Sequence, residues 1–141
     1  MNESFRARTG QDTAVTAYGT GPVAYGGGRE ADYYEHGTAA ERWARAQLFF
    51  EAKDFTAAAR ILRGLVDGDP QPVAPRLLLA RAYYHSARLE RAEAELRAVL
   101  ERDPVESYAR LMLGRTLERQ GRADEGAGQL RIAAALGADG A

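Results

Sequence analysis

Cysteine is absent from the 141-residue sequence, and histidine occurs only twice. Without cysteine, disulfide frameworks, thiolate zinc sites and cysteine catalysis are excluded. The longest uninterrupted apolar run, at 132–136, has only five residues, whereas a membrane span needs about 20 and a secretory leader about 7–15. We therefore expect a cytoplasmic protein without a membrane partner, made of one domain or of one domain and a tail.

An excess of positive or negative charge is also lacking. The 19 Lys and Arg residues nearly balance the 20 Asp and Glu residues, and Lys53 is the only lysine. Residues 39–141 hold 16 basic and 15 acidic side chains, so this region has no net field that would attract nucleic acid. Glu93, Glu95 and Glu101 alternate with arginines, and we expect them to form near-neighbour ion pairs on a solvated helix face.

Patterns for catalysis and metal binding are missing as well. A catalytic dyad or a metal site would need a second ligand near His36 or His85, and the acids near His36 are better explained as solvated charged residues. No serine lies in a nucleophile-elbow pattern, and the glycines at 26–28 are not followed by the Lys-Ser or Lys-Thr pair of a phosphate loop. The sequence therefore predicts a non-enzyme with no cofactor and no metal.

Residues 1–38 differ from the rest of the chain, because they contain neither leucine nor isoleucine and are rich in glycine. With so little apolar area to bury, ordering this segment would cost more backbone entropy than it recovers. We predict a flexible tail. Its four tyrosines, at positions 18, 25, 33 and 34, could dock on the domain or on a partner, although a solvated leader is the simpler interpretation.

From Thr38 onward the sequence is rich in Ala, Arg, Leu and Glu, which favour helices. Thr38 and Glu41 have the spacing of a capping box. Asp103 and Pro104 precede a later helix, since proline suits the first helical turn. Breaks in the apolar periodicity divide the region into six helices, which we predict at residues 39–52, 55–68, 72–86, 89–102, 105–120 and 123–136.

The helical region repeats every 34 residues without a gap, in the segments 39–72, 73–106 and 107–140. Small residues recur in two columns of this alignment, and large apolar residues recur in two others. The small columns are Ala46, Ala80, Gly114 and Ala58, Ala92, Gly126; the large columns are Phe49, Tyr83, Leu117 and Leu62, Leu96, Leu130. We expect the small residues to let paired helices approach closely and the large ones to fill the core between them.

This pattern resembles the tetratricopeptide repeat, a helix–turn–helix unit of 34 residues. The middle repeat matches the family pattern best, with Leu79, Ala80 and Tyr83 in its first helix. The first repeat departs most, because Arg45 stands where the family has leucine. The resemblance implies an all-α fold, a right-handed superhelix of three repeats after a disordered N-terminal tail, and a non-enzymatic protein-interaction module.

Members of the family hold extended peptides on the concave side, which the first helix of each pair lines. The resemblance assigns this groove to Trp43, Gln47, Phe50 and Glu51 in the first repeat, to Leu77, Arg81, Tyr84 and His85 in the second, and to Tyr108, Leu111, Arg115 and Arg119 in the third. Arg81 and Arg115 are one period apart, so we expect them to stand side by side and bind carboxylates of an acidic partner peptide. Alternatively, Phe50 and Tyr84 belong to the core. The carboxylate clamp of chaperone-binding members is absent, because none of its positions is basic here.

The last helix suggests a second class of function. It has no covering helix after it, and it contains Gly126 and Gly128, each of which costs about 0.5–1 kcal/mol relative to alanine inside a helix. We expect this end to be weak or covered. The alternative is therefore an assembly module, a homo-oligomer formed through the uncovered last helix or through the tail.

Overall fold

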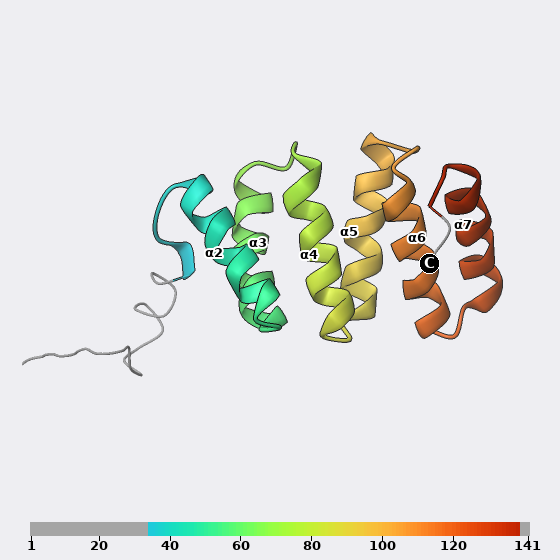
Figure 1. Cartoon of the computed structure of the whole chain (residues 1–141), viewed down its shortest axis with the longest axis horizontal. Coiled ribbons are helices and arrows are strands. Elements are labelled where there is room, and N and C mark those ends of the chain that lie inside the picture. The colour runs from blue at the N-terminus through green and yellow to red at the C-terminus, as the bar shows by residue number, and fades with distance from the viewer. Residues whose placement is uncertain (1–33, 139–141) are drawn as a thin grey trace, which may run out of the picture. The chain divides into compact units, whose positions relative to one another are not determined.

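The computed structural model describes residues 34–138, which form only helices and the turns between them. The helices are α2 (Ala39–Glu51), α3 (Phe55–Gly68), α4 (Val73–His85), α5 (Leu89–Arg102), α6 (Ser107–Arg119) and α7 (Ala123–Ala135). They lie side by side in chain order, each antiparallel to the one before it (Figure 1). The prediction of six helices in three pairs is confirmed, and each predicted boundary lies within two residues of the observed one.

The chain divides into two compact units, residues 1–36 and 37–141, and all six helices belong to the second. The predicted flexible tail, residues 1–38, lies outside the described residues except for its last five. Of these five, Tyr34 and Glu35 have helical backbone, and Thr38 is the N-cap of α2.

The capping box at the start of α2 is present as predicted. The Thr38 hydroxyl accepts a hydrogen bond from the Glu41 N–H at 3.1 Å, and the Glu41 carboxylate accepts one from the Thr38 N–H at 2.8 Å. Two backbone donors that α2 cannot satisfy internally are therefore paired, which sets where the helix begins.

The predicted start of the fifth helix at residue 105 is wrong by two residues. Glu106 is the N-cap of α6, and its Oε2 accepts hydrogen bonds from the N–H groups of Tyr108 and Ala109 at 2.9 and 3.3 Å. Pro104 lies in the preceding turn, where its carbonyl accepts hydrogen bonds from Arg110 at 3.0 and 3.1 Å. The start of α6 is thus set by the side-chain cap of Glu106, and the fixed φ angle of Pro104 does not set it.

The three turns within the helix pairs share one backbone geometry. Each has one residue in the left-handed region, at Lys53 (φ 64°), Ala87 (φ 63°) and Gly121 (φ 81°), and these positions are spaced by one repeat. The same hydrogen bond closes each turn, from an N–H to the carbonyl five residues earlier: Asp54 to Phe49 at 2.9 Å, Arg88 to Tyr83 at 2.8 Å, and Arg122 to Leu117 at 2.9 Å. The 34-residue period therefore extends to the backbone of the turns.

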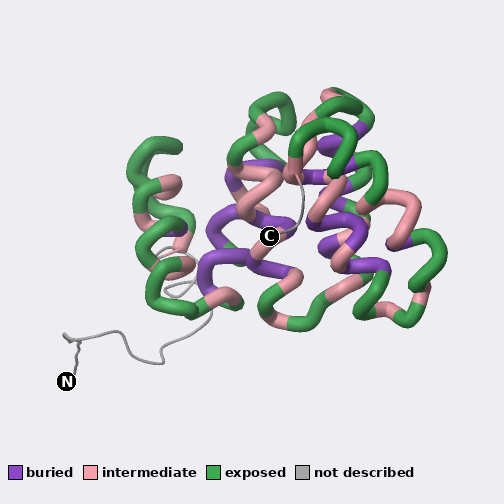
Figure 2. Tube along the Cα trace, turned by 45° about the vertical axis from the view of Figure 1, so that its right-hand side comes forward, coloured by how far each residue is buried: buried purple, intermediate pink, exposed green. Residues whose placement is uncertain are grey.

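Most residues of the columns predicted to pack between helices are buried in the core, while Phe49 and Leu130 are only half-buried. Ala46, Ala58, Ala80 and Ala92 are fully buried, and so are Leu62 and Leu96. In Figure 2 the buried segments lie along the sides of helices that face their neighbours, while the outer turns are exposed. Because every helix buries residues against the next, the stack continues from one repeat to the following one.

Helices α6 and α7 of the third pair approach each other closely, and glycine replaces alanine there in both small columns. A Cβ on Gly114 would lie 2.7 Å from Leu130 Cδ2, and a Cβ on Gly126 would lie 2.8 Å from the carbonyl oxygen of Gly114. The expectation that Gly126 weakens α7 is therefore incomplete, because α6 and α7 could not pack at this distance with a side chain there. Gly128 has no such role, since its added Cβ would meet only Arg131 Nη2, at 3.8 Å.

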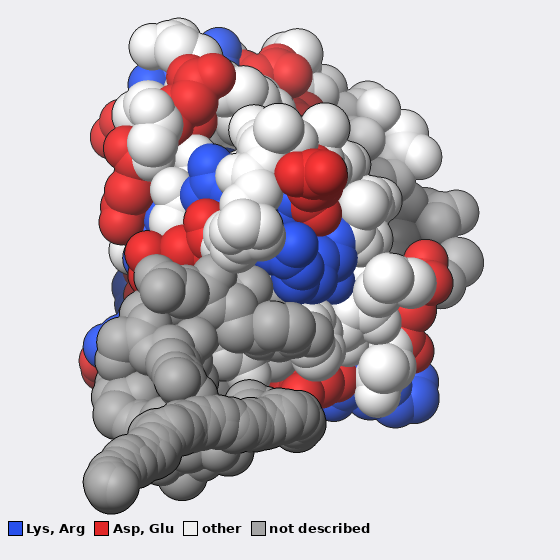
Figure 3. All heavy atoms as spheres, turned by 90° about the vertical axis from the view of Figure 1, so that its left-hand side faces the viewer, with Lys and Arg blue, Asp and Glu red and all other residues white. Residues whose placement is uncertain are grey.

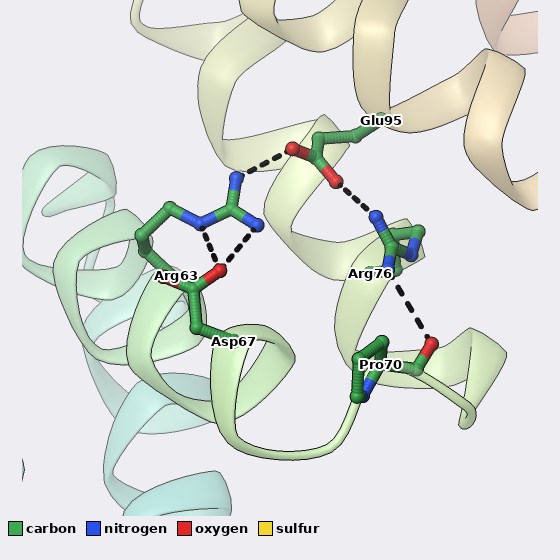
Figure 4. A network of polar contacts seen from close by, with 5 residues as sticks. All are labelled: Arg63, Asp67, Pro70, Arg76 and Glu95. Atoms are coloured by element: carbon green, nitrogen blue, oxygen red, sulfur yellow. Dashed lines mark hydrogen bonds and ion pairs between the residues drawn. The ribbon is translucent and has the colours of Figure 1, made fainter.

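The expected solvated position of Glu95 is wrong, although Glu93 does pair with its near neighbour Arg97. Glu95 is only 7% exposed, and its two carboxylate oxygens bind arginines from other helices (Figure 4). Arg63 Nη1 of α3 lies 2.5 Å from one oxygen, and Arg76 Nη1 of α4 lies 2.9 Å from the other. Glu95 thus connects the first repeat to both helices of the second.

Candidate functional site

The residues assigned to the groove lie on α2, α4 and α6, the first helices of the three pairs. Helices α4 and α6 contact each other directly, and Phe50 of α2 reaches Arg81 and His85 of α4. We call the surface built by Phe50, Arg81, Tyr84, Tyr108 and Arg119 the first-helix face. Its members come from all three repeats, so stacking brings together residues up to 69 positions apart.

Arg81 is held between two aromatic rings. Its guanidinium carbon lies 4.8 Å from the ring centroid of Phe50 in the first repeat and 5.7 Å from that of Tyr108 in the third. Its Nε is buried without a hydrogen-bond partner. Stacking restricts the plane of a guanidinium but does not use its N–H donors. Arg81 is thus positioned to bind a planar oxyanion through N–H donors at the edge of its guanidinium.

A compact group of rings, which we call the four-ring cluster, lies beside Arg81 and consists of Phe50, Phe55, Tyr84 and His85. The His85 ring stacks on Phe55 with centroids 4.7 Å apart and planes at 21°. Phe50 and Tyr84 approach the same imidazole edge-on, at 5.9 and 5.5 Å. Helices α2, α3 and α4 supply the cluster, at the end where α2 and α4 finish and α3 begins.

A second arginine borders the four-ring cluster. The guanidinium carbon of Arg119 lies 4.6 Å from the ring centroid of Tyr84, and its Nη1 donates a hydrogen bond to the Tyr84 carbonyl at 2.8 Å. Partial burial and the positive charges of Arg81, Arg119 and Lys53 lower the pKa of His85 below its usual value. This end of the first-helix face is therefore electropositive, although the whole chain carries a formal net charge of −1.

Other predicted groove residues have different surroundings. Arg115 forms an ion pair with Glu118 at 3.2 Å. Leu77, Tyr84 and Tyr108 are partly buried against the hydrophobic core. Trp43 and Leu111 are half-buried, and Gln47 and Glu51 are exposed. The alternative that Tyr84 packs with the core thus applies to part of its surface.

Phe55 belongs to the four-ring cluster and Lys53 acts on His85 through its charge, and the sequence pattern indicated neither residue. Both lie at the turn between α2 and α3, outside the first helices from which the groove residues were taken. The sequence does contain one indication of Lys53: the only lysine of the chain occupies the turn position where the third repeat has Gly121.

The described residues 34–138 contain no group of three or more His, Asp or Glu side chains that could hold a metal ion. None of the helices in this range is long and apolar enough to cross a membrane. One face of the molecule, seen in Figure 3, carries acidic and basic side chains with uncharged ones between them.

Comparisons with known proteins agree with this fold. Residues 49–113 match the family model of the tetratricopeptide repeat. None of the curated proteins matches the chain. Among solved structures, a MamA point mutant superposes with a TM-score of 0.63 at 18% identity, covering 66% of this chain and 68% of the other.

Two further MamA structures have the same TM-score of 0.63 at 19% identity, and each covers 70% of this chain. One is MamA from Desulfovibrio magneticus RS-1, beginning at its position 41, and the other is a double mutant of MamA from RS-1. The chain spans about half of these two, with 54% and 53% of their lengths covered. Residues 49–113 thus resemble the tetratricopeptide repeat, and the pairs α2–α3, α4–α5 and α6–α7 stack in the fold that the MamA structures share.

Proposed function

We propose that the protein is a non-enzymatic interaction module whose first-helix face binds an acidic segment of a partner protein. The observation that carries this proposal is the position of Arg81, whose guanidinium lies over the rings of Phe50 and Tyr108 and whose buried Nε has no hydrogen-bond partner among residues 34–138. An arginine that is oriented by stacking and still has free donors suits a carboxylate of a bound peptide.

Apolar contact would come from the half-buried side chains on the same three helices. Trp43, Leu77, Tyr108 and Leu111 are each partly accessible, and large rigid side chains of this kind give contact area at a low entropic cost. We therefore expect the partner segment to alternate acidic and apolar residues, with the apolar ones on α2, α4 and α6. Arg115 would take part by exchanging Glu118 for a partner carboxylate, since the Arg115–Glu118 pair is partly exposed.

The test uses labelled 12-residue peptides of alternating Asp or Glu and Leu, with amide counterparts in which Asn or Gln replaces each acid. We expect fluorescence anisotropy to detect binding of the acidic peptides only. The double variant R81E/R115E should lose this binding, while R88E/R131E, with the same change of charge outside the face, should keep it. The variant R81Q removes the guanidinium but keeps the first part of the apolar stem, so it disturbs packing less than R81E. A loss of peptide binding in R81Q would therefore reflect the missing guanidinium and not unfolding. Unchanged binding by R81E/R115E would move the site away from the first-helix face.

A second candidate function is self-association through α7, and a specific observation favours it. Ile132 of α7 and Leu136, the C-cap of that helix, are 41% and 37% exposed, and a spacing of four residues places them close together at the end of the helix. Exposed apolar residues at the end of a repeat stack are suited to contact with a second copy. Sedimentation at rising concentration tests this, and I132S/L136S should remain monomeric where the wild type dimerises. A concentration-independent monomer would eliminate this candidate.

A further inference from the structure

Two cationic side chains, Arg81 and Arg119, contact rings of the four-ring cluster, and a third cation, Lys53, lies in the turn beside it. Lys53 belongs to the turn after α2, Arg81 to α4 and Arg119 to α6, and the charges of all three act on His85. We infer that Arg81 and Arg119 form an oxyanion subsite, which takes one carboxylate or phosphate group through contacts beside the His85 ring, with the charge of Lys53 adding to the attraction. The role of this subsite in holding a partner segment rests on the proposed function, whereas the subsite itself does not.

The three cations lack anionic partners. Within the part of the chain that the structure describes, no carboxylate lies within ion-pair distance of Lys53, Arg81 or Arg119. This contrasts with Arg63, Arg76, Arg97 and Arg122, each of which is paired. Cations that border the same cluster without a counterion favour the binding of an anion.

The nearby carboxylates are engaged elsewhere or exposed to solvent. Asp54 accepts a hydrogen bond from the Ala57 N–H at 3.2 Å and so caps α3. Glu118 of α6 pairs with Arg115. Glu51, at the end of α2, is exposed. Among the described residues, the subsite therefore has no internal anion that a ligand would have to displace.

Two of the cations are held in place before a ligand arrives. Arg81 stacks between Phe50 and Tyr108, and Arg119 stacks on Tyr84 and binds its carbonyl. Fixing a long side chain in advance reduces the entropy that binding must otherwise remove. The remaining N–H donors of the two guanidinium groups are suited to the oxygens of a carboxylate or a phosphate.

His85 reports on this subsite. Partial burial and the three cations lower its pKa, and a bound anion would cancel part of the positive potential and raise the pKa again. Binding should therefore take up a proton. The sign of the linkage follows: an anion binds more tightly as the pH falls through the interval between the two pKa values of His85, free and bound.

The experiment follows the imidazole proton signals of the full chain by NMR during a pH titration, in inorganic phosphate and in chloride at equal ionic strength. The chain has only two histidines, so the H36Q variant assigns both signals. We expect phosphate to raise the pKa of His85, and acetate at the same ionic strength to do so more weakly. The double variant R81Q/R119Q should lose the response, while the control R88Q/R131Q should keep it.

A His85 titration that is the same in phosphate and in chloride would overturn the inference, as would a full response in R81Q/R119Q. The outcome is separable from that of the proposed function. If acidic peptides bind the first-helix face without moving His85, the peptide site stands and the oxyanion subsite does not. If phosphate moves His85 but no acidic peptide binds, the subsite stands and the proposed function fails.

Discussion

Arg76 and Glu95 form an ion pair between α4 and α5, with Nη1 2.9 Å from Oε1 and 13% and 10% of their side chains exposed. One repeat later the same positions hold Arg110 and Gln129, whose Nη1 and Oε1 lie 3.1 Å apart. In both repeats the arginine also bonds to the carbonyl of the proline six residues earlier. The contact is thus a repeated feature of the helix pairs, with a charged acceptor in the second repeat and a neutral acceptor in the third.

Replacing Glu95 by alanine should lower the free energy of unfolding by about 2–4 kcal/mol, because two arginines lose a buried acceptor. This loss of unfolding free energy is smaller than for a fully buried ion pair, since 38% of the Arg63 side chain is exposed and can be solvated. Urea denaturation measures the change. The exposed residue Glu101 on the same helix gives the matched control E101A. Equal effects of the two substitutions would show that the network contributes no stability of its own.

The reverse change in the third helix pair, Gln129→Glu, should stabilise the protein by up to about 1 kcal/mol. The new carboxylate would accept from Arg110 and offer a second acceptor to Arg97, the residue one period after Arg63. Thermal unfolding checks the sign of the effect. A destabilised Q129E would mean that the third repeat cannot bury a charge at this position.

Two glycines of α7 should respond to alanine in opposite directions. Gly126→Ala should destabilise by about 1–3 kcal/mol, because its Cβ would overlap the rigid backbone of α6. Gly128→Ala has room for its Cβ and should stabilise by about 0.5–1 kcal/mol through the higher helix propensity of alanine. Denaturant midpoints of the two variants test the prediction directly. Stabilisation by both would show that α6 and α7 can separate without cost.

Ala87 is a non-glycine residue at φ 63°, in the turn position where the third repeat has Gly121. Left-handed backbone costs an L-residue about 1–2 kcal/mol, so Ala87→Gly should stabilise by up to about 1 kcal/mol after the added entropy of the unfolded glycine. Gly121→Ala should lower the stability by a similar amount. Its added Cβ would meet no atom within 4 Å, so only backbone strain acts at this position. Melting temperatures that move in the same direction for both variants would contradict this explanation.

Glu93 should make the stability depend on pH in the acid range. Burial would raise its pKa, but hydrogen bonds from Arg97 and Arg122 lower that pKa overall, below its usual value of 4.5. Because the folded state binds the proton more weakly than the unfolded state, the contribution of Glu93 is present above pH 4.5 and is lost as the pH falls through its folded pKa. The variant E93Q should be less stable at neutral pH by about 1 kcal/mol, and this difference should shrink toward about pH 3. If the stability difference between E93Q and the wild type stays constant across the acid range, the loss of stability comes from packing and not from the charge of Glu93.

The sequence alone was sufficient for the helices and their pairing. The 34-residue columns predict which residues are small at the helix crossings and which are large, because both depend on local periodicity that every repeat reproduces. The capping box at Thr38 was also predictable, since its two partners are three residues apart. Even the left-handed turn at Gly121 has a local signal in its glycine.

Only the tertiary structure decided where the long charged side chains go. Glu95 alternates with arginines along its helix, yet it is buried against arginines 19 and 32 residues away. Arg81 and Arg115 occupy equivalent positions, yet one stacks between two rings and the other pairs with Glu118. The reason is physical: an arginine or glutamate side chain reaches over several ångströms and chooses among partners from neighbouring repeats, and those partners become neighbours only when the repeats stack.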